Sequence, residues 1–518
     1  MTQAPATVQQ HGSVEQVALL TARLDRLPAS RYLWRLIILL SLCGFFEIYE
    51  IALTSTLSPG LIRAGVFKDA KGLLGLTDQA GFAAATFLGL FVGTAAFAAV
   101  ADRFGRRRVL IGSLLWYVAA TAAMAAQNTA ISVDSWRLIA GIGVGVQLVT
   151  IDSYIAELVP RKLRGRAFAV NYGLMYLAAP VAALLSWLLL PETPLGLSGW
   201  RYVSLFPLCG TAVAWWVYRL LPESPRWLLQ QGAVAEAERV VSKIESEVWG
   251  ELGGDRAASE GIPSGGDRAA TERRPSGQRG NPQRGPAREP PAGASEGIPS
   301  GGDLPVPAAQ PETATGGSGF GELFRPPYLR RTVMLLALNI FQALGFYGFT
   351  NWVPALLLSQ GVSFVKSLQY SFVIAIVYPL TPLLCIFIAD RIERKWQIVI
   401  GATGTAVFGL LFSQQSAPVT LILCGALVTV SNIVLSYSYH AYQTELYPTR
   451  IRARAVGFVY SFSRLATILS GFAIAIALRD FGTTGVFVFI ASCMLVVVLT
   501  VSSLGPRTVG LTLEEASH

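Results

Sequence analysis

Twelve apolar stretches alternate with short polar segments along the chain. Most of them approach or exceed the roughly 20 residues that an α-helix needs to cross the hydrocarbon of a membrane. Lipid offers no hydrogen-bond partners, so helices that satisfy their own backbone are the expected form of these stretches. The predicted spans, numbered 1 to 12 in order, are residues 32–57, 79–101, 109–127, 134–156, 167–190, 200–221, 331–358, 367–389, 396–413, 418–441, 454–477 and 482–503.

The Lys and Arg residues outside the spans concentrate in alternate loops. DRFGRRR, PRKLRGR, DRIERK and PTRIRAR follow spans 2, 4, 8 and 10, whereas the intervening loops PETPLGLSG and SQQSAP contain neither residue. Positive charge marks the cytoplasmic loops of membrane proteins. We therefore predict an all-α, multi-pass membrane protein with both termini in the cytoplasm.

A polar region separates the spans into two groups of six. It is rich in Gly, Pro, Ser, Ala and Arg, a composition that cannot bury enough apolar surface to form a folded unit. Before it, Ser224 is placed to cap a helix that starts at Pro225, and Gly232 is expected to divide this region into two short helices. The expected organisation is a cytoplasmic segment 1–31, a six-helix half 32–221, cytoplasmic helices 222–249, a disordered linker 250–320, a second six-helix half 321–503 and a cytoplasmic tail 504–518.

Composition and charge exclude other classes of protein. The chain of 518 residues is 52% hydrophobic and 14% charged, whereas soluble domains usually carry about a quarter charged residues. The net charge of +9 lies in short segments between spans, so nucleic acid is not an expected partner. The five cysteines fall within apolar stretches, which argues against a disulfide framework. GIGVG at 141–145 also lies within a span, where small residues permit close helix packing rather than nucleotide binding.

The two groups of spans repeat one another. AELVPRKLRGRA from Ala156 returns as TELYPTRIRARA from Thr444, and ADRFGRRRV from Ala101 returns as ADRIERKWQ from Ala389, in both cases 288 residues later. Two matches with one offset indicate a tandem pair of six-helix halves. Parallel halves of this kind place a cavity at their interface near the middle of the membrane, and rocking exposes the cavity to each side in turn.

These motifs resemble the major facilitator superfamily over nearly the whole chain except the linker. ADRFGRRR is similar to the superfamily's loop between spans 2 and 3, and RLIAGIGVG, PESPR and GLTLEE are similar to its sugar-porter and organic-ion branches. NIFQALGFYGFTNWVP in span 7 lacks the paired glutamines of sugar porters and resembles bacterial metabolite and niacin-type proton symporters. The resemblance implies a secondary transporter of a small organic solute in a bacterial inner membrane.

Ionisable side chains within the spans cost about 2.5–3.5 kcal/mol each at mid-membrane and are therefore functional candidates. Glu47 and Glu50 lie three residues apart in span 1, so both can face one cavity. Glu50 and Arg137 of span 4 are expected at similar depth and could pair. The resemblance to proton-coupled porters implies that Glu50 carries a proton and that Arg137 acts as its switch. The alternative is a static ion pair that joins two helices.

Three further ionisable groups lie within the spans. Asp152 in span 4 and His440 in span 10 occupy equivalent places in the repeat, and each could titrate or be a satisfied structural group. Arg464 lies near the middle of span 11. The resemblance to organic-anion carriers implies that it attracts a negatively charged substrate, and its forked donors suit a carboxylate. The alternative is an internal partner such as Glu47.

Aromatic and amide side chains complete the predicted substrate site. Span 7 supplies most of them, and its Gly345 and Gly348 are expected to let the helix bend. An aromatic cluster beside a cation suits a small ring-bearing carboxylate, although each ring could instead serve packing. The predicted substrate-binding residues are Arg464, Gln342, Asn339, Tyr347, Asn351, Trp352, Asn171 and Tyr176, and the predicted proton-coupling residues are Glu50, Arg137, Glu47 and Asp152.

The repeated basic loops are predicted to form a cytoplasmic gate. Glu157 and Glu445 end spans 4 and 10 beside basic residues, and such charge clusters can hold the cytoplasmic face shut until they separate. The predicted gate residues are Asp102, Arg103, Arg106, Glu157, Arg164, Arg166, Asp390, Arg391, Glu445, Arg452 and Arg454.

The predicted function is proton-coupled symport of a small organic solute, with an organic or aromatic carboxylate favoured. A sugar or polyol proton symporter is the alternative on the same fold, and a non-transporting nutrient sensor is the alternative of another class. The sequence contains no arrangement of nucleophile, base and orienting group and no metal-ligand spacing. We therefore expect no enzyme activity, cofactor or metal; the expected partners are substrate, protons and the lipid bilayer.

Overall fold

The computed structural model describes residues 19–20, 22–68, 78–259, 320–326, 328–389, 391–447 and 449–506. Within these residues the chain is helical apart from turns and short connections, and the membrane helices belong to one compact unit. Ten helical segments are long and apolar enough to cross a membrane, and one of them, Ala455–Leu504, contains two spans. Together with α4 (Asp78–Phe104) they make twelve spans, so the predicted all-α fold of two six-helix halves is confirmed.

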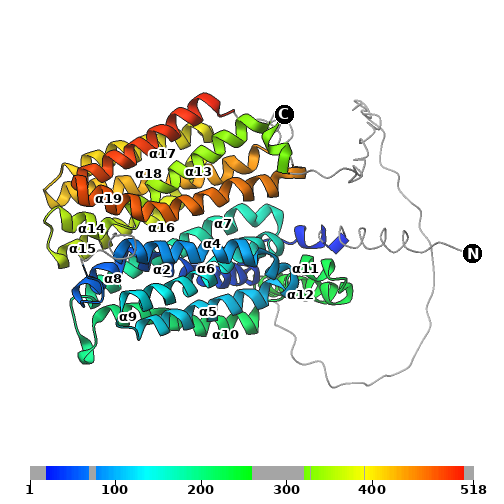
Figure 1. The fold of residues 1–518 in the computed structure, drawn as a ribbon. Coiled ribbons are helices and arrows are strands. Elements are labelled where there is room, and N and C mark those ends of the chain that lie inside the picture. The colour runs from blue at the N-terminus through cyan, green and yellow to red at the C-terminus, as the bar shows by residue number, and fades with distance from the viewer. Residues whose placement is uncertain are drawn as a thin grey trace, which may run out of the picture. The chain divides into compact units, whose positions relative to one another are not determined.

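The first half is drawn from blue to green in Figure 1. Two of its helices begin at side-chain caps: the Ser30 hydroxyl accepts from the N–H of Leu33, and the Thr129 hydroxyl accepts from that of Ser132. Gly105, with a φ of 92°, turns the chain between the second and third spans. Besides α4, the helices are α2 (Arg31–Thr56), α3 (Ser58–Arg63), α5 (Arg106–Ala125), α6 (Ala130–Leu158), α7 (Arg161–Tyr176), α8 (Ala178–Leu189), α9 (Gly199–Leu205) and α10 (Gly210–Leu220).

The second half packs beside the first and is drawn from green to red in Figure 1. Its last helix runs through spans 11 and 12, and Gly482, with a φ of 65°, turns the chain between them. The helices are α13 (Tyr328–Thr350), α14 (Val353–Ser359), α15 (Phe364–Ala375), α16 (Val377–Ala389), α17 (Arg394–Ser413), α18 (Pro418–Glu445) and α19 (Thr449–Leu504).

Span 7 differs from its prediction. Residues 331–358 do not form one helix, because a turn at Asn351 and Trp352 separates α13 from α14. The helix α13 is continuous through Gly345 and Gly348, so the expected bending at these glycines stays a prediction. A Cβ atom at either glycine would collide with a side chain of α19. The two glycines therefore allow close packing of α13 against α19.

Glycines also bring two helices of the first half together. Gly89 and Gly93 of α4 face Gly141 and Gly145 of α6, and a Cβ atom at any of the four would lie 2.2–2.6 Å from a backbone oxygen of the facing helix. The GIGVG sequence thus serves helix packing, as predicted.

Two helices follow span 6 at the end of the bundle that carries the basic loops (Figure 1). We call this end the inner end, following the predicted orientation, and the opposite end the outer end. α11 (Pro225–Gln230) begins as predicted, with the Ser224 hydroxyl accepting from the N–H of Trp227, and Gly232 separates it from α12 (Val234–Ser259). The helix α12 is longer than predicted and passes residue 250, where the linker was expected to start; residues 260–319 lie outside the described residues.

The segment before α2 packs on α12. Leu20, Leu24 and Leu27 are buried in one hydrophobic cluster with residues of α12. Arg23 forms an ion pair with Glu245 of α12, and the hydrogen bond from Arg23 to this carboxylate raises the pKa of Arg23. The helix α12 is thereby tied to the chain that leads into span 1.

Candidate functional site

A buried ion pair joins spans 1 and 4 of the first half. Arg137 on α6 donates to a carboxylate oxygen of Glu50 on α2 at 2.6 Å, and each side chain is 1% exposed. The guanidinium also donates to the Glu50 backbone carbonyl and to the hydroxyls of Thr86 at 2.9 Å and Thr54 at 3.2 Å. It lies over the ring of Phe82 as well. The predicted pairing is confirmed, and every nitrogen of Arg137 is engaged within the first half.

Glu47, one turn from Glu50 on α2, has different surroundings. Its side chain is 0% exposed, and neither of its carboxylate oxygens has a hydrogen-bond partner in the described part of the chain. Its charge interacts with those of Asp152 on α6 and Arg464 on α19. Asp152 is half-buried and accepts a hydrogen bond from the Tyr172 hydroxyl at 3.3 Å. Glu47 thus lies within electrostatic reach of a carboxylate of its own half and of a cation of the second.

Arg464 lies near the middle of span 11 and is 4% exposed. It donates to the Tyr460 hydroxyl at 2.7 Å and to the Tyr347 hydroxyl on α13 at 3.5 Å, and its Nε has no partner among the described residues. No described carboxylate forms an ion pair with it. An arginine held by hydroxyl groups keeps its full charge for an anionic ligand.

Aromatic rings connect the two halves around this arginine. Phe87 of α4 meets Tyr347 of α13 edge-on at 4.8 Å between ring centres. Tyr176 of α7 stacks on Tyr172 and lies 6.1 Å from the ring of Tyr378 on α16. The tyrosines predicted in spans 5 and 7 therefore do lie at the interface of the halves.

The repeat relates several of these side chains to one another. Three pairs of equivalent positions, 288 residues apart, lie among them. The first pair is a tyrosine in both halves. The second is an aspartate in the first half and a histidine in the second, and the third is a tyrosine in the first half and the arginine in the second. These pairs are Tyr172 with Tyr460, Asp152 with His440, and Tyr176 with Arg464. Tyr460, which holds Arg464, had no place in the predicted site, although its equivalence to Tyr172 could have identified it.

Four predicted substrate residues have other surroundings. Asn339 is fully buried and donates to Gln443 of α18 at 3.4 Å, and Asn171 donates to the sulfur of Met175 at 3.1 Å. Asn351 and Trp352 lie in the turn at the outer end of α13, where Trp352 lines a cavity of about 200 Å³. They lie at another depth than Arg464, which is in mid-span, so their part in substrate binding stays a prediction. Gln342 is 3% exposed on α13.

Two equivalent ion pairs lie at the inner end. Arg106 at the start of α5 pairs with Glu157 of α6 at 3.2 Å, and Arg394 at the start of α17 pairs with Glu445 of α18 at 2.5 Å. Ser224 donates to the other oxygen of Glu157. Sequence reasoning missed Arg394, although the 288-residue offset from Arg106 points to it. Each pair joins helices of one half, so neither pair by itself latches the halves together.

The remaining gate residues give no further support to a latch. Arg103, Arg166 and Arg391 are exposed, and Arg164 donates to the Val159 carbonyl at 3.4 Å. The side chains of Asp102, Arg452 and Arg454, and the whole of Asp390, lie outside the described structure. The cytoplasmic gate stays a prediction.

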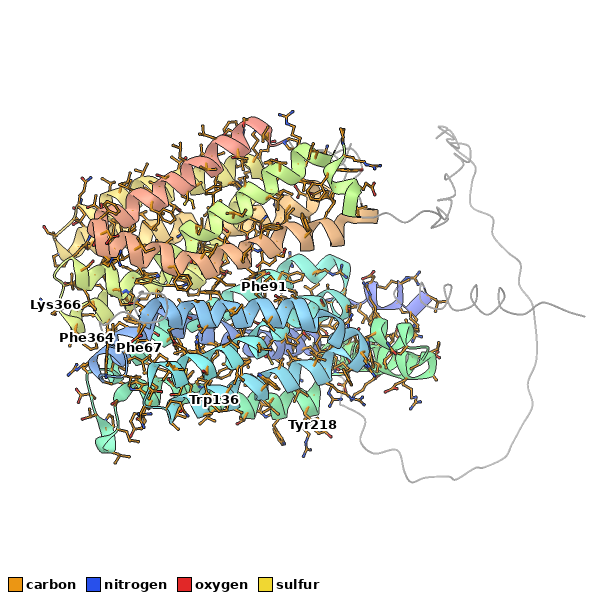
Figure 2. The ribbon with its side chains drawn as sticks, viewed as in Figure 1. Phe67, Phe91, Trp136, Tyr218, Phe364 and Lys366 are labelled. Atoms are coloured by element: carbon orange, nitrogen blue, oxygen red, sulfur yellow. The ribbon has the colours of Figure 1, made fainter. Side chains whose placement is uncertain are left out.

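Side chains of the two halves meet at the outer end. Arg63 at the end of α3 lies 5.1 Å from the ring centre of Phe364 on α15, and Trp187 of α8 stacks on Phe372 of α15 at 5.9 Å. Figure 2 shows Phe364 at this end of the bundle. His440, near the inner end of α18, is by contrast exposed. The described contacts thus join the two halves at the outer end.

Two similar six-helix halves, with charged and tyrosine side chains where they meet, define a secondary transporter of the membrane. Residues 36–264 and 308–518 match the family described as Sugar (and other) transporter, so the chain belongs to that family. It is a multi-pass membrane transporter of small molecules rather than an enzyme.

Relatives span nearly the whole chain. The "Putative metabolite transport protein YyaJ" of Bacillus subtilis (strain 168) is 30% identical over 488 residues, which cover 94% of this chain and 95% of that protein. The niacin transporter NiaP of Acinetobacter baylyi is 23% identical over 496 residues, covering 96% and 99%. Among solved structures, a partially occluded inward open conformation of the xylose transporter XylE from E. coli has a TM-score of 0.67 at 19% identity, covering 93% of this chain and 100% of that one.

Proposed function

We propose that the protein imports a small organic carboxylate together with protons across a bacterial inner membrane. The observation that carries this proposal is the buried Arg464, which tyrosine hydroxyls hold and which no described carboxylate pairs. A guanidinium offers a carboxylate two parallel N–H donors. The tyrosine rings around it suit a ring-bearing substrate, and one relative is named as a niacin transporter.

Glu50 is the proposed proton carrier, and Arg137 is its switch. Contact with the guanidinium favours the ionised carboxylate, whereas burial without it favours the protonated form, so separation of the pair during rocking would change the proton affinity of Glu50. One proton imported with a carboxylate monoanion moves no net charge, so the pH gradient and not the membrane potential drives accumulation. At one proton per substrate, each unit of pH gradient supports about tenfold accumulation.

A sugar or polyol is the second candidate substrate. Gln342 and Asn339 are buried amides on span 7, and amides suit hydroxyl groups as donors and acceptors. The similar solved structure is a xylose transporter, which agrees with this candidate. At 19% identity, however, that similarity supports the fold alone.

Uptake into proteoliposomes with a more acidic exterior distinguishes the candidates. Radiolabelled nicotinate and benzoate are compared with xylose and myo-inositol. Accumulation of a carboxylate alone supports the proposal, whereas accumulation of a sugar alone transfers the function to the second candidate. Carboxylate uptake that ignores the pH gradient would remove the proton coupling. A thermal shift with a ligand that is not transported would indicate a nutrient sensor.

A further inference from the structure

We infer that the substrate carboxylate binds in the second half at the place that a carboxylate of the protein itself, that of Asp152, occupies in the first half. Its donors there are the hydroxyl of Tyr460 and the guanidinium of Arg464. This site rests on the proposed carboxylate substrate. It adds Tyr460 as a substrate-binding residue and gives the carboxylate a defined position.

A tyrosine of the first half already binds a carboxylate. The Tyr172 hydroxyl on α7 donates to a carboxylate oxygen of Asp152 on α6 at 3.3 Å. The repeat places Tyr460 on α19 at the position equivalent to Tyr172, and His440 on α18 at the position equivalent to Asp152. Duplicated helices present the same faces to equivalent neighbours. The hydroxyl of Tyr460 should therefore serve the equivalent place, where the second half has no acid.

His440 does not take over the role of the acid. Its Nδ1 lies 2.7 Å from the backbone carbonyl oxygen of Ser436, which can only accept, so Nδ1 donates to it. The imidazole meets the ring of Tyr460 edge-on, at 5.5 Å between ring centres, and no hydrogen bond joins the two side chains within the described residues. Position 440 thus lies beside Tyr460, but the acceptor of the first half is missing.

Arg464 supplies a positive charge where the first half has Tyr176. The guanidinium lies over the Tyr460 ring, 4.9 Å from its centre, and donates to the Tyr460 hydroxyl at 2.7 Å. Because a guanidinium only donates, the hydroxyl accepts this bond and keeps its own hydrogen, for which the described residues offer no acceptor. A hydroxyl that accepts from a cation is polarised into a stronger donor. The Nε of Arg464 is buried and also has no partner in the described structure.

A carboxylate matches these free donors. One of its oxygens can accept from the Tyr460 hydroxyl and the other from the Nε–H of Arg464, and its charge balances that of the guanidinium. A sugar hydroxyl could accept the same hydrogen bonds, but it would leave the charge of Arg464 unbalanced at a side chain that is 4% exposed. The donors therefore select a monoanion over a neutral solute.

His440→Asp tests the position, because it restores in the second half the acid of the first. Its carboxylate should reach Tyr460 and Arg464 and compete with the substrate. Binding of nicotinate or benzoate should weaken about tenfold to hundredfold, the effect of one hydrogen bond to a charged group. His440→Asn is the matched control: it has the shape of aspartate without the charge and should keep binding. The measurement is the ligand-induced rise in Tm in detergent.

The reach of position 440 is tested without substrate. In H440D the new carboxylate pairs with Arg464, so addition of R464Q should lower the Tm more in the H440D background than in the H440N background. Equal losses in the two backgrounds would show that an acid at position 440 does not reach the guanidinium, and the assigned position would be wrong.

Tyr460→Phe tests the hydroxyl and does not depend on the folding of H440D. It keeps the ring beneath Arg464 and removes the O–H donor, so carboxylate binding should weaken about tenfold. Unchanged binding would remove Tyr460 from the site.

The outcomes separate this site from the proposed function. If nicotinate or benzoate binds the unmodified protein and binds H440D as tightly as H440N, the carboxylate lies elsewhere, and the assigned position is overturned while the proposed substrate class stands. If neither carboxylate binds the unmodified protein, the proposed substrate class fails and the assigned site fails with it.

Discussion

Glu50→Gln tests the proposed proton switch most directly. The amide keeps the shape of the side chain and one acceptor oxygen for Arg137, but it removes the charge that balances the guanidinium. Arg137 retains the hydroxyls of Thr86 and Thr54 and the backbone carbonyl of residue 50 as acceptors. The variant therefore resembles the state in which Glu50 is protonated, and we expect it to fold.

The structure sets two magnitudes for this substitution. Removal of one partner from a buried ion pair costs about 3–5 kcal/mol, and this is an upper bound here because the amide and three other acceptors remain. In transport, one coupled proton contributes a factor of about ten to the accumulation ratio per unit of pH gradient. E50Q should therefore lower accumulation about tenfold at a gradient of one pH unit.

The assay is uptake of labelled substrate into proteoliposomes, with and without a pH gradient. Counterflow without a gradient needs no net proton movement and should persist in E50Q. Glu192→Gln is the control, because Glu192 is an exposed carboxylate in the loop after span 5. Accumulation by E50Q that equals that of the unmodified protein would show that Glu50 does not carry the coupled proton and that the pair is static.

Three further predictions follow from the described contacts. Arg464→Gln should weaken carboxylate uptake about tenfold to hundredfold, because a hydrogen bond to a charged group contributes about 1.5–3 kcal/mol; unchanged uptake in proteoliposomes would exclude Arg464 from the site. Gly145→Ala should lower the Tm or prevent folding, because the added Cβ would lie 2.4 Å from a backbone oxygen of α4. Gly112→Ala is the control and should keep the Tm, because no atom lies within 4 Å of its added Cβ. Equal Tm values for the two variants would contradict this packing. Arg106→Gln should lower the Tm more than Arg394→Gln, because the first ion pair is more deeply buried. The side chains of Arg106 and Glu157 are 9% and 15% exposed, whereas those of Arg394 and Glu445 are 23% and 20% exposed. Equal losses of Tm would show that burial does not rank the two pairs.

The spans, the repeat and the pairing of Glu50 with Arg137 could be predicted because each depends on position along one helix. Hydropathy and length give a span, and the direction of a span gives the depth of a residue within it. The break in span 7 was not predicted, because residues 331–358 were taken as one helix that could bend at its glycines. Pro354 at the start of α14 was the better signal, since proline lacks the N–H that continues a helix.

Contacts between side chains of different halves could not be predicted in the same way, because they depend on how closely two helices approach and which faces they present. Trp352 and Arg464 both lie in apolar, aromatic stretches of the sequence, yet the structure places them at different depths along their spans. The repeat offers a partial remedy. It identifies Arg394 from Arg106 and Tyr460 from Tyr172, because duplicated helices present the same faces to equivalent neighbours.

The positions at which the repeat fails are more informative about function than those at which it holds. Both halves keep the inner-end pair of arginine and glutamate, which ties neighbouring helices within each half. The chemistry is not duplicated: the equivalents of Glu47, Glu50 and Arg137 are Leu335, Leu338 and Gly425, and the equivalent of Arg464 is Tyr176. The proposed proton residues therefore belong to one half and the proposed substrate cation to the other. Because the pair of Glu50 and Arg137 lies within the first half and Arg464 lies in the second, rocking of the halves can couple proton binding to substrate binding, and the two become parts of one equilibrium.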